Sequence, residues 1–201
     1  LNSRITMKFG KLFCLIGLLV LIGSCNEKTA NQSQTNEDHS LHQPTEESPK
    51  PSKSPKKTAM EIVDGNHIHI DYSSPGVRGR TIFGELIPYN ELWRAGANDA
   101  TWIETNKDLE VGSQSLPAGK YGIFVIPNKD KWTVIFNTRW EQHGTDKYIE
   151  KEDVFRVDVM PTTLENLQEH LEYKVIKSDE QSGIISLAWE KTKVEIPFSQ
   201  K

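Results

Sequence analysis

The amino-acid sequence predicts an all-β domain: an antiparallel β-sandwich, or flattened barrel, of about 8–10 short strands with one long ordered loop and little helix. Three observations support this class. Apolar and polar residues alternate with a period of two over most of residues 58–201. The alternating runs are short and evenly spaced, and turn-forming residues separate them. Stretches with a helical spacing of apolar residues are few.

The first expected element is a β-hairpin. Residues 60–63 and 67–73 flank the turn sequence Asp64-Gly65-Asn66. Side chains alternate between the two faces of a strand, so the second arm has one apolar and one polar face. Ile68, Ile70 and Tyr72 form the apolar face, and His67, His69 and Asp71 form the polar face.

Further strands follow along the chain. We expect them at residues 100–105, 108–111, 120–127, 131–138, 154–160, 171–177, 183–190 and 193–198. Pro197 suits an edge strand or the end of a strand, because proline cannot donate to a β-ladder. A turn or two of helix is expected at residues 85–93, and another at residues 163–170.

The N-terminal residues 1–24 have the pattern of a lipoprotein signal peptide, with residues 1–6 upstream of the expected start at Met7. A short positive region precedes the charge-free apolar run of residues 12–23, which is short for a membrane span. The run ends in Gly23-Ser24-Cys25, which resembles a bacterial lipobox. The 176 residues after Cys25 contain no cysteine, so a disulfide role is excluded for it. We therefore expect a lipid on Cys25 and a location in the bacterial cell envelope, with the membrane and leaflet left open.

Residues 25–57 are expected to form a polar, proline-containing tether, because they offer too little apolar surface to fold. Residues 58–201 then form a single domain with one core. This domain has 16 Lys and Arg against 23 Asp and Glu, a formal charge of -7. Nucleic acid is excluded as a partner, because its phosphates require a basic surface.

The alternation fails in residues 72–101, which hold Arg78, Arg80 and Arg94, three of the domain's five arginines. Long irregular segments within compact domains are often functional. The apolar residues of this loop indicate that it is packed and ordered. Two interpretations stay open. The guanidinium groups hydrogen-bond the carbonyls of the loop, or they bind an anionic or carbohydrate-like ligand together with Asn98 and Tyr72 or Tyr89.

The same segment and several later runs carry a family resemblance. The residues concerned lie at 72–80, 82–84, 88–89, 93–101, 116–121, 132–135 and 187–190. They resemble a bacterial envelope family catalogued as a domain of unknown function, number 2911, and the likeness extends over essentially the whole domain. The resemblance implies a secreted or lipid-anchored β-rich domain and supplies no activity, substrate or catalytic residue.

Two further groups of residues are candidates for binding a ligand. His67 and His69 share a strand face and, with His143 from a later loop, have the residue types of a zinc-type site. The alternative is a solvated polar face. The loop sequence Trp140-Glu141-Gln142-His143 suits one wall of a carbohydrate or small-molecule site, or a tryptophan that anchors its loop to the core.

The chain lacks the motifs of several enzyme classes: G-x-S-x-G, the P-loop, the dinucleotide glycine pattern, H-E-x-x-H and a cysteine nucleophile. Catalytic residues and a cofactor are therefore not expected. The leading hypothesis is a non-catalytic binding or accessory module on a lipid tether, with a small anion, a sugar or an envelope protein as its partner. The alternatives are a structural or protein-interaction module whose arginines brace the loop, and a metal-dependent envelope hydrolase.

Overall fold

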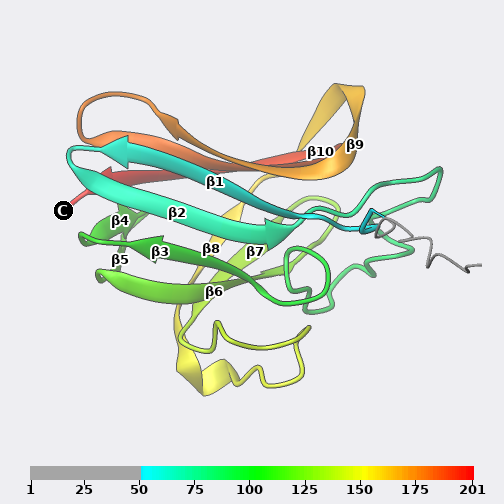
Figure 1. Cartoon of the computed structure of the whole chain (residues 1–201), viewed down its shortest axis with the longest axis horizontal. Helices are drawn as coiled ribbons and strands as arrows, with labels where there is room; N and C mark the ends of the chain where they lie inside the picture. Colours follow the sequence, from blue (N-terminus) through cyan, green and yellow to red (C-terminus); the bar gives the residue numbers. More distant parts are fainter. Residues whose placement is uncertain (1–50) are drawn as a thin grey trace, which may run out of the picture. The chain divides into compact units, whose positions relative to one another are not determined.

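The computed structural model describes residues 51–201, which form two antiparallel sheets (Figure 1). The six-stranded sheet has the order β1-β2-β3-β6-β7-β8, and the four-stranded sheet the order β5-β4-β10-β9. Within the described residues, one short 3-10 helix, Glu150–Glu152, precedes β8. The strands are β1 (Lys56–Val63), β2 (Asn66–Ser73), β3 (Thr101–Thr105), β4 (Leu109–Val111), β5 (Gln114–Leu116), β6 (Gly119–Ile126), β7 (Trp132–Asn137), β8 (Asp153–Val159), β9 (Thr162–Lys177) and β10 (Ser182–Gln200).

The apolar residues of the alternating runs face the core, and the polar residues face the surface. In β2, Ile68 and Ile70 are fully buried, whereas His67 and His69 on the opposite face are partly exposed. The core lies between the sheets and combines residues from both, among them Ile103 of β3 and Leu187 of β10. The expected β-sandwich, with its first hairpin, is therefore confirmed. Within residues 51–201, no helix has the length and apolar character needed to cross a membrane.

The predictions of helical turns at residues 85–93 and 163–170 are both wrong. Residues 163–170 belong to β9, because β10 supplies ladder partners for them: Gln168 pairs with Glu190 and Thr163 with Thr192. Residues 85–93 form irregular turns in which backbone hydrogen bonds join Ile82 to Ile87. The two runs expected at 183–190 and 193–198 form one strand, β10, which is irregular on either side of Glu190. The three-residue β5 was not expected.

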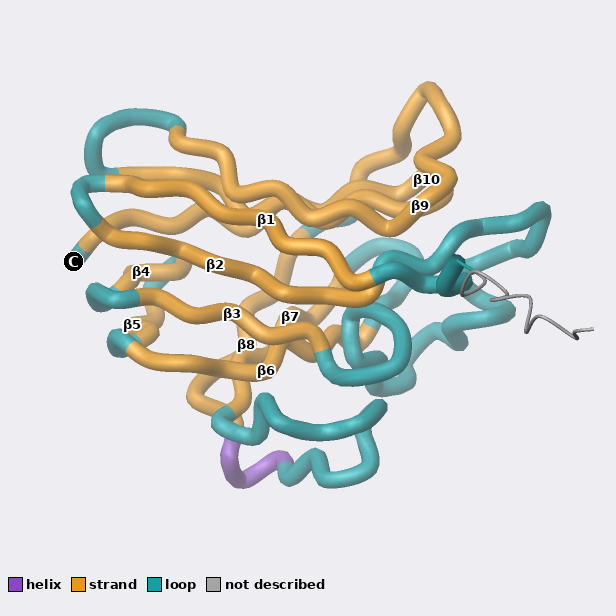
Figure 2. Tube along the Cα trace, in the orientation of Figure 1, coloured by secondary structure: helices purple, strands orange, loops and turns teal. Residues whose placement is uncertain are grey.

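The long connection between β2 and β3, residues 74–100, consists of loops and turns (Figure 2). It is packed, as expected, because several of its apolar residues are buried. Trp93 pairs with Val125 of β6 through two backbone hydrogen bonds of 2.8 Å. The connection contributes Ile82 and Phe83 to the core, where Phe83 and Trp93 contact two further tryptophans. Trp132 of β7 and Trp189 of β10 complete this aromatic cluster.

A smaller apolar cluster lies on the other face of the six-stranded sheet. Ala100, Phe124 and Ile135 are buried there, and Tyr148 packs on Phe124 with a ring separation of 5.1 Å. Tyr148 belongs to the connection between β7 and β8, residues 138–152, so this connection covers part of the outer face. The β2–β3 connection reaches the same cluster through Ala100, so both long connections contribute to this face of the sheet.

Candidate functional site

The side chains of Arg78 and Arg80 both donate to backbone carbonyls: Arg80 to the bend on which it lies, and Arg78 to the segment before β1. The Nη2 group of Arg78 donates to the carbonyl of Lys53 at 2.6 Å. Arg80 donates from Nε to the carbonyl of Val77 at 3.0 Å and from Nη2 to that of Gly76 at 2.6 Å. These contacts match the interpretation in which arginines satisfy loop carbonyls.

Arg94 is different. The pairing of Trp93 with β6 and a hydrogen bond from Trp93 Nε1 to the carbonyl of Gly96 (3.0 Å) fix the backbone on both sides of it. Its Nε group is buried, and no residue of the described range 51–201 accepts a hydrogen bond from it. The same is true of the indole Nε1 of Trp189, a residue that is 1% exposed.

These two unpaired donors belong to residues that line the same hollow, which we call the arginine pocket. Its volume is about 390 Å³. Four cationic residues line it, and no Asp or Glu of residues 51–201 does. None of the three arginines that line the pocket forms an ion pair with a carboxylate of residues 51–201. The lining consists of Lys53, Ser54, Pro75, Gly76, Arg78, Arg80, Leu86, Ile87, Trp93, Arg94, Gly96, Ala97 and Trp189.

The other residues predicted for this site lie elsewhere. Asn98 is exposed, with its amide 3.5 Å from Ser73 Oγ. Tyr72 is buried against Tyr173, and Tyr89 lines a separate hollow beside Phe83. The structure therefore brings the three arginines together without these polar partners. Trp189 was not among the predicted residues, because a buried strand tryptophan gives no sequence signal that its N–H lacks a partner.

The three histidines of the possible metal site are not gathered around one point. His69 Nε2 lies 2.9 Å from Asp71 Oδ1, and the rings of His67 and His69 are 6.1 Å apart. His143 Nδ1 lies 3.4 Å from Asp99 Oδ1. Among residues 51–201, no three His, Cys, Asp or Glu side chains are placed to hold a metal ion.

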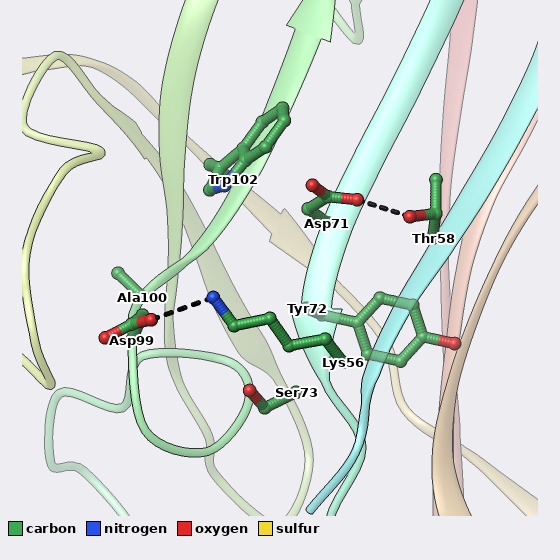
Figure 3. A pocket seen from close by; sticks show the side chains of 8 residues that line it. All are labelled: Lys56, Thr58, Asp71, Tyr72, Ser73, Asp99, Ala100 and Trp102. Carbon is green, nitrogen blue, oxygen red and sulfur yellow. Dashed lines mark hydrogen bonds and ion pairs between the residues drawn. The ribbon is translucent and has the colours of Figure 1, made fainter.

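A second concave region lies on the outer face of β1, β2 and β3 (Figure 3). It consists of two hollows of about 160 and 410 Å³ that share Lys56, Asp99, Ala100 and Trp102. Trp140, from the loop after β7, lines the larger one. We call the two hollows together the tryptophan groove.

Two carboxylates of this groove are already held by neighbouring groups. A hydrogen bond from Lys56, whose Nζ is 3.3 Å from Asp99, and a second from His143 lower the pKa of the Asp99 carboxyl. At Asp71, burial alone would raise the pKa, but hydrogen bonds from Thr58 and His69 outweigh it and lower the value. Both groups are therefore ionised acceptors at neutral pH.

The fold and the first pocket together define an antiparallel β-sandwich domain with a cationic hollow beside its longest loop. The chain belongs to the family described as "Protein of unknown function (DUF2911)", which matches residues 54–198. This match confirms the family to which the run of residues 72–101 pointed. No curated protein and no solved structure matches the chain.

Proposed function

We propose that this protein is a non-catalytic binding module of the bacterial cell envelope that takes a small oxyanion (a carboxylate, phosphate or sulfate group) in the arginine pocket. One observation carries the proposal. Two buried N–H donors, Arg94 Nε and Trp189 Nε1, lack partners within residues 51–201, and both belong to residues that line a hollow without carboxylates.

The energetics favour a ligand there. A buried donor without an acceptor costs about 1–3 kcal/mol, and two such donors are unusual in one small hollow. An oxyanion accepts hydrogen bonds from both donors, and the pocket's four cationic side chains compensate its charge. Leu86 and Ile87 give the same hollow an apolar side.

The location is part of the proposal. Cys25 and the preceding apolar run lie outside the described residues, and they support a lipid anchor through their sequence alone. The polar residues between Cys25 and β1, which begins at Lys56, are expected from their composition to serve as a tether. Residues 53 and 54, at the end of that tether, also line the arginine pocket.

A second candidate is a structural or protein-interaction module. Arg78 and Arg80 favour it, because both hold loop carbonyls. Arg94 separates the two candidates, since its side chain has no such contact among the described residues.

Isothermal titration calorimetry on the purified full chain tests the proposal, with inorganic phosphate, sulfate, citrate and glucuronate as titrants. We expect at least one anion to bind with one-to-one stoichiometry. Arg94→Met should then weaken it at least tenfold, equivalent to about 1.4 kcal/mol, and Trp189→Phe severalfold.

Arg139→Met is the matched control, because Arg139 is an exposed arginine paired with Glu152 at 2.8 Å. It should bind like the wild type. The proposal is wrong if no anion binds, or if Arg94→Met and Arg139→Met bind equally well.

A further inference from the structure

The tryptophan groove has an aromatic wall that two distant segments build. Trp102 lies on β3 and Trp140 in the loop after β7, and both are only partly buried. Their ring centroids are 5.9 Å apart with an interplanar angle of 62°. Partly exposed indoles side by side in a concave surface are an uncommon use of tryptophan, because each leaves a large apolar face in water.

Lys120 fixes this wall. Its ammonium lies 3.3 Å from the ring centroid of Trp102 and 4.0 Å from that of Trp140. Lys120 lines neither hollow of the groove, so it holds the two indoles without occupying the concave space. A wall that is ordered in advance lowers the entropic cost of binding a ligand.

The polar residues of the groove offer both donors and acceptors. Asp99 and Glu141 are acceptors, Lys56 is a donor, and His143 can serve as either. Asp99 is paired with Lys56 and His143, and Asp71 with His69 and Thr58, so Glu141 is the one carboxylate of the groove without an ion pair among residues 51–201. The ammonium of Lys56 opposes a cationic ligand. The groove thus has charged residues of both signs, whereas the charged residues of the arginine pocket are all cationic.

We infer that the tryptophan groove is a second binding site, for a neutral oligosaccharide. A pyranose ring has an apolar C–H face that stacks on an indole and a rim of hydroxyl groups that both donate and accept hydrogen bonds. Trp140 stacks on one sugar ring. Trp102, whose ring is already contacted by Lys120 and His69, borders the neighbouring sugar ring, and Asp99, His143 and Lys56 contact the hydroxyl groups. The inference is independent of the anion in the arginine pocket, because the two sites have no lining residue in common.

The test uses the purified full chain on a microarray of bacterial and plant glycans, followed by calorimetry with the strongest neutral oligosaccharide found. We expect saturable binding, with the Kd raised at least tenfold in Trp140→Ala and in Trp102→Ala. Trp140→Phe, which keeps an aromatic face, should recover part of the affinity. His143→Ala, an exposed position, should weaken binding severalfold without a change in the thermal unfolding midpoint.

Lys131→Met is the control, because Lys131 is exposed and lines neither hollow of the groove, and it should bind the oligosaccharide like the wild type whether or not an anion binds to the arginine pocket. Three results would overturn the inference. The first is an array without a neutral glycan signal. The second is glycan binding that Trp140→Phe and His143→Ala leave unchanged while the tryptophan-to-alanine variants lose it only by unfolding. The third is choline, used as the cationic probe, binding to the groove in place of the glycan.

Discussion

At the scale of single residues, the three arginines of the β2–β3 connection do different work. Arg78 and Arg80 each donate to backbone carbonyls of their own surroundings, at distances down to 2.6 Å. Arg94 lines the same hollow, its Nη1 lies near Gly144 of the β7–β8 connection, and its buried Nε has no acceptor among residues 51–201. Residue type alone does not distinguish these roles, since the difference depends on where the carbonyls of the folded loop point.

The first prediction compares Arg80→Met with Arg94→Met in the absence of ligand. Arg80→Met removes two hydrogen bonds from a charged donor and should lower the free energy of unfolding by about 1–2 kcal/mol. Arg94→Met removes a buried donor that has no partner in the described range, so the free energy of unfolding should stay the same or rise by up to about 1 kcal/mol.

Urea denaturation of the wild type and both variants gives these differences. A loss of 2 kcal/mol or more in Arg94→Met would assign that residue a structural role and contradict the account of the pocket.

At the scale of elements, Gly122 of β6 lets the loop after β7 approach the sheet. A Cβ atom at this position would lie 2.8 Å from the Phe124 ring, 3.1 Å from the carbonyl oxygen of Arg139 and 3.3 Å from the Cα of Trp140. Because two of these neighbours are backbone atoms, the loop must move to make room.

The second prediction is therefore that Gly122→Ala lowers the free energy of unfolding by about 1–3 kcal/mol and separates Trp140 from Trp102. Denaturation measures the first effect, and a changed near-ultraviolet circular dichroism spectrum reports the second. Unchanged stability together with an unchanged spectrum would show that the loop does not depend on this close approach.

The other end of the same loop is held by Tyr148. Its hydroxyl lies 2.9 Å from both carboxylate oxygens of Asp153 and accepts a hydrogen bond from Arg156 at 3.1 Å. Burial and the hydrogen bond to Asp153 raise the pKa of Tyr148 to about 12. The folded state thus keeps a proton on this hydroxyl that the unfolded state loses from about pH 10.

The third prediction follows from this difference in pKa. The contribution of Tyr148 to stability is complete below about pH 10 and is lost as the pH rises toward 12, because the unfolded state then binds fewer protons than the folded state. Between pH 9 and 12 the melting temperature of the wild type should fall more steeply than that of Tyr148→Phe. Parallel curves of melting temperature against pH for the two proteins would contradict the raised pKa of Tyr148. Lysine titration affects both proteins equally, so it does not contribute to the difference between them.

At the scale of the whole molecule, the sequence predicts those strands that have one apolar and one polar face. The alternation of Ile68 and Ile70 with polar neighbours marks β2 without any knowledge of its partners. Residues 163–170 lack such alternation, and only their pairing with β10 makes them a strand. The failure of alternation in residues 74–100 correctly located the long connection and its arginines.

The residues of the candidate sites were harder to predict from the sequence than the strands. The arginines were found because they stand together in one irregular stretch, but Trp189 enters the pocket from β10, far along the chain. Trp102 and Trp140 meet only through the order of the strands, in which β6 lies between β3 and β7. Contacts between distant segments depend on sheet topology, which a single sequence does not specify.

The fourth prediction concerns the anchor. If Cys25 is lipidated, the wild-type chain expressed in bacteria should partition into the detergent phase of a Triton X-114 separation and carry a mass increment of acyl chains. Cys25→Ser should move to the aqueous phase, and Cys14→Ser, within the signal sequence, should behave like the wild type. Equal partitioning of all three proteins would exclude the lipid anchor.

The most direct measurement for the central claim is a crystal structure of the full chain soaked in selenate, an oxyanion that anomalous scattering locates without ambiguity. The account predicts a selenium peak in the arginine pocket, with selenate oxygens at hydrogen-bond distance, about 2.7–3.2 Å, from Arg94 Nε and Trp189 Nε1. A pocket that holds only water at saturating selenate, with both donors bonded to protein carbonyls, would contradict it.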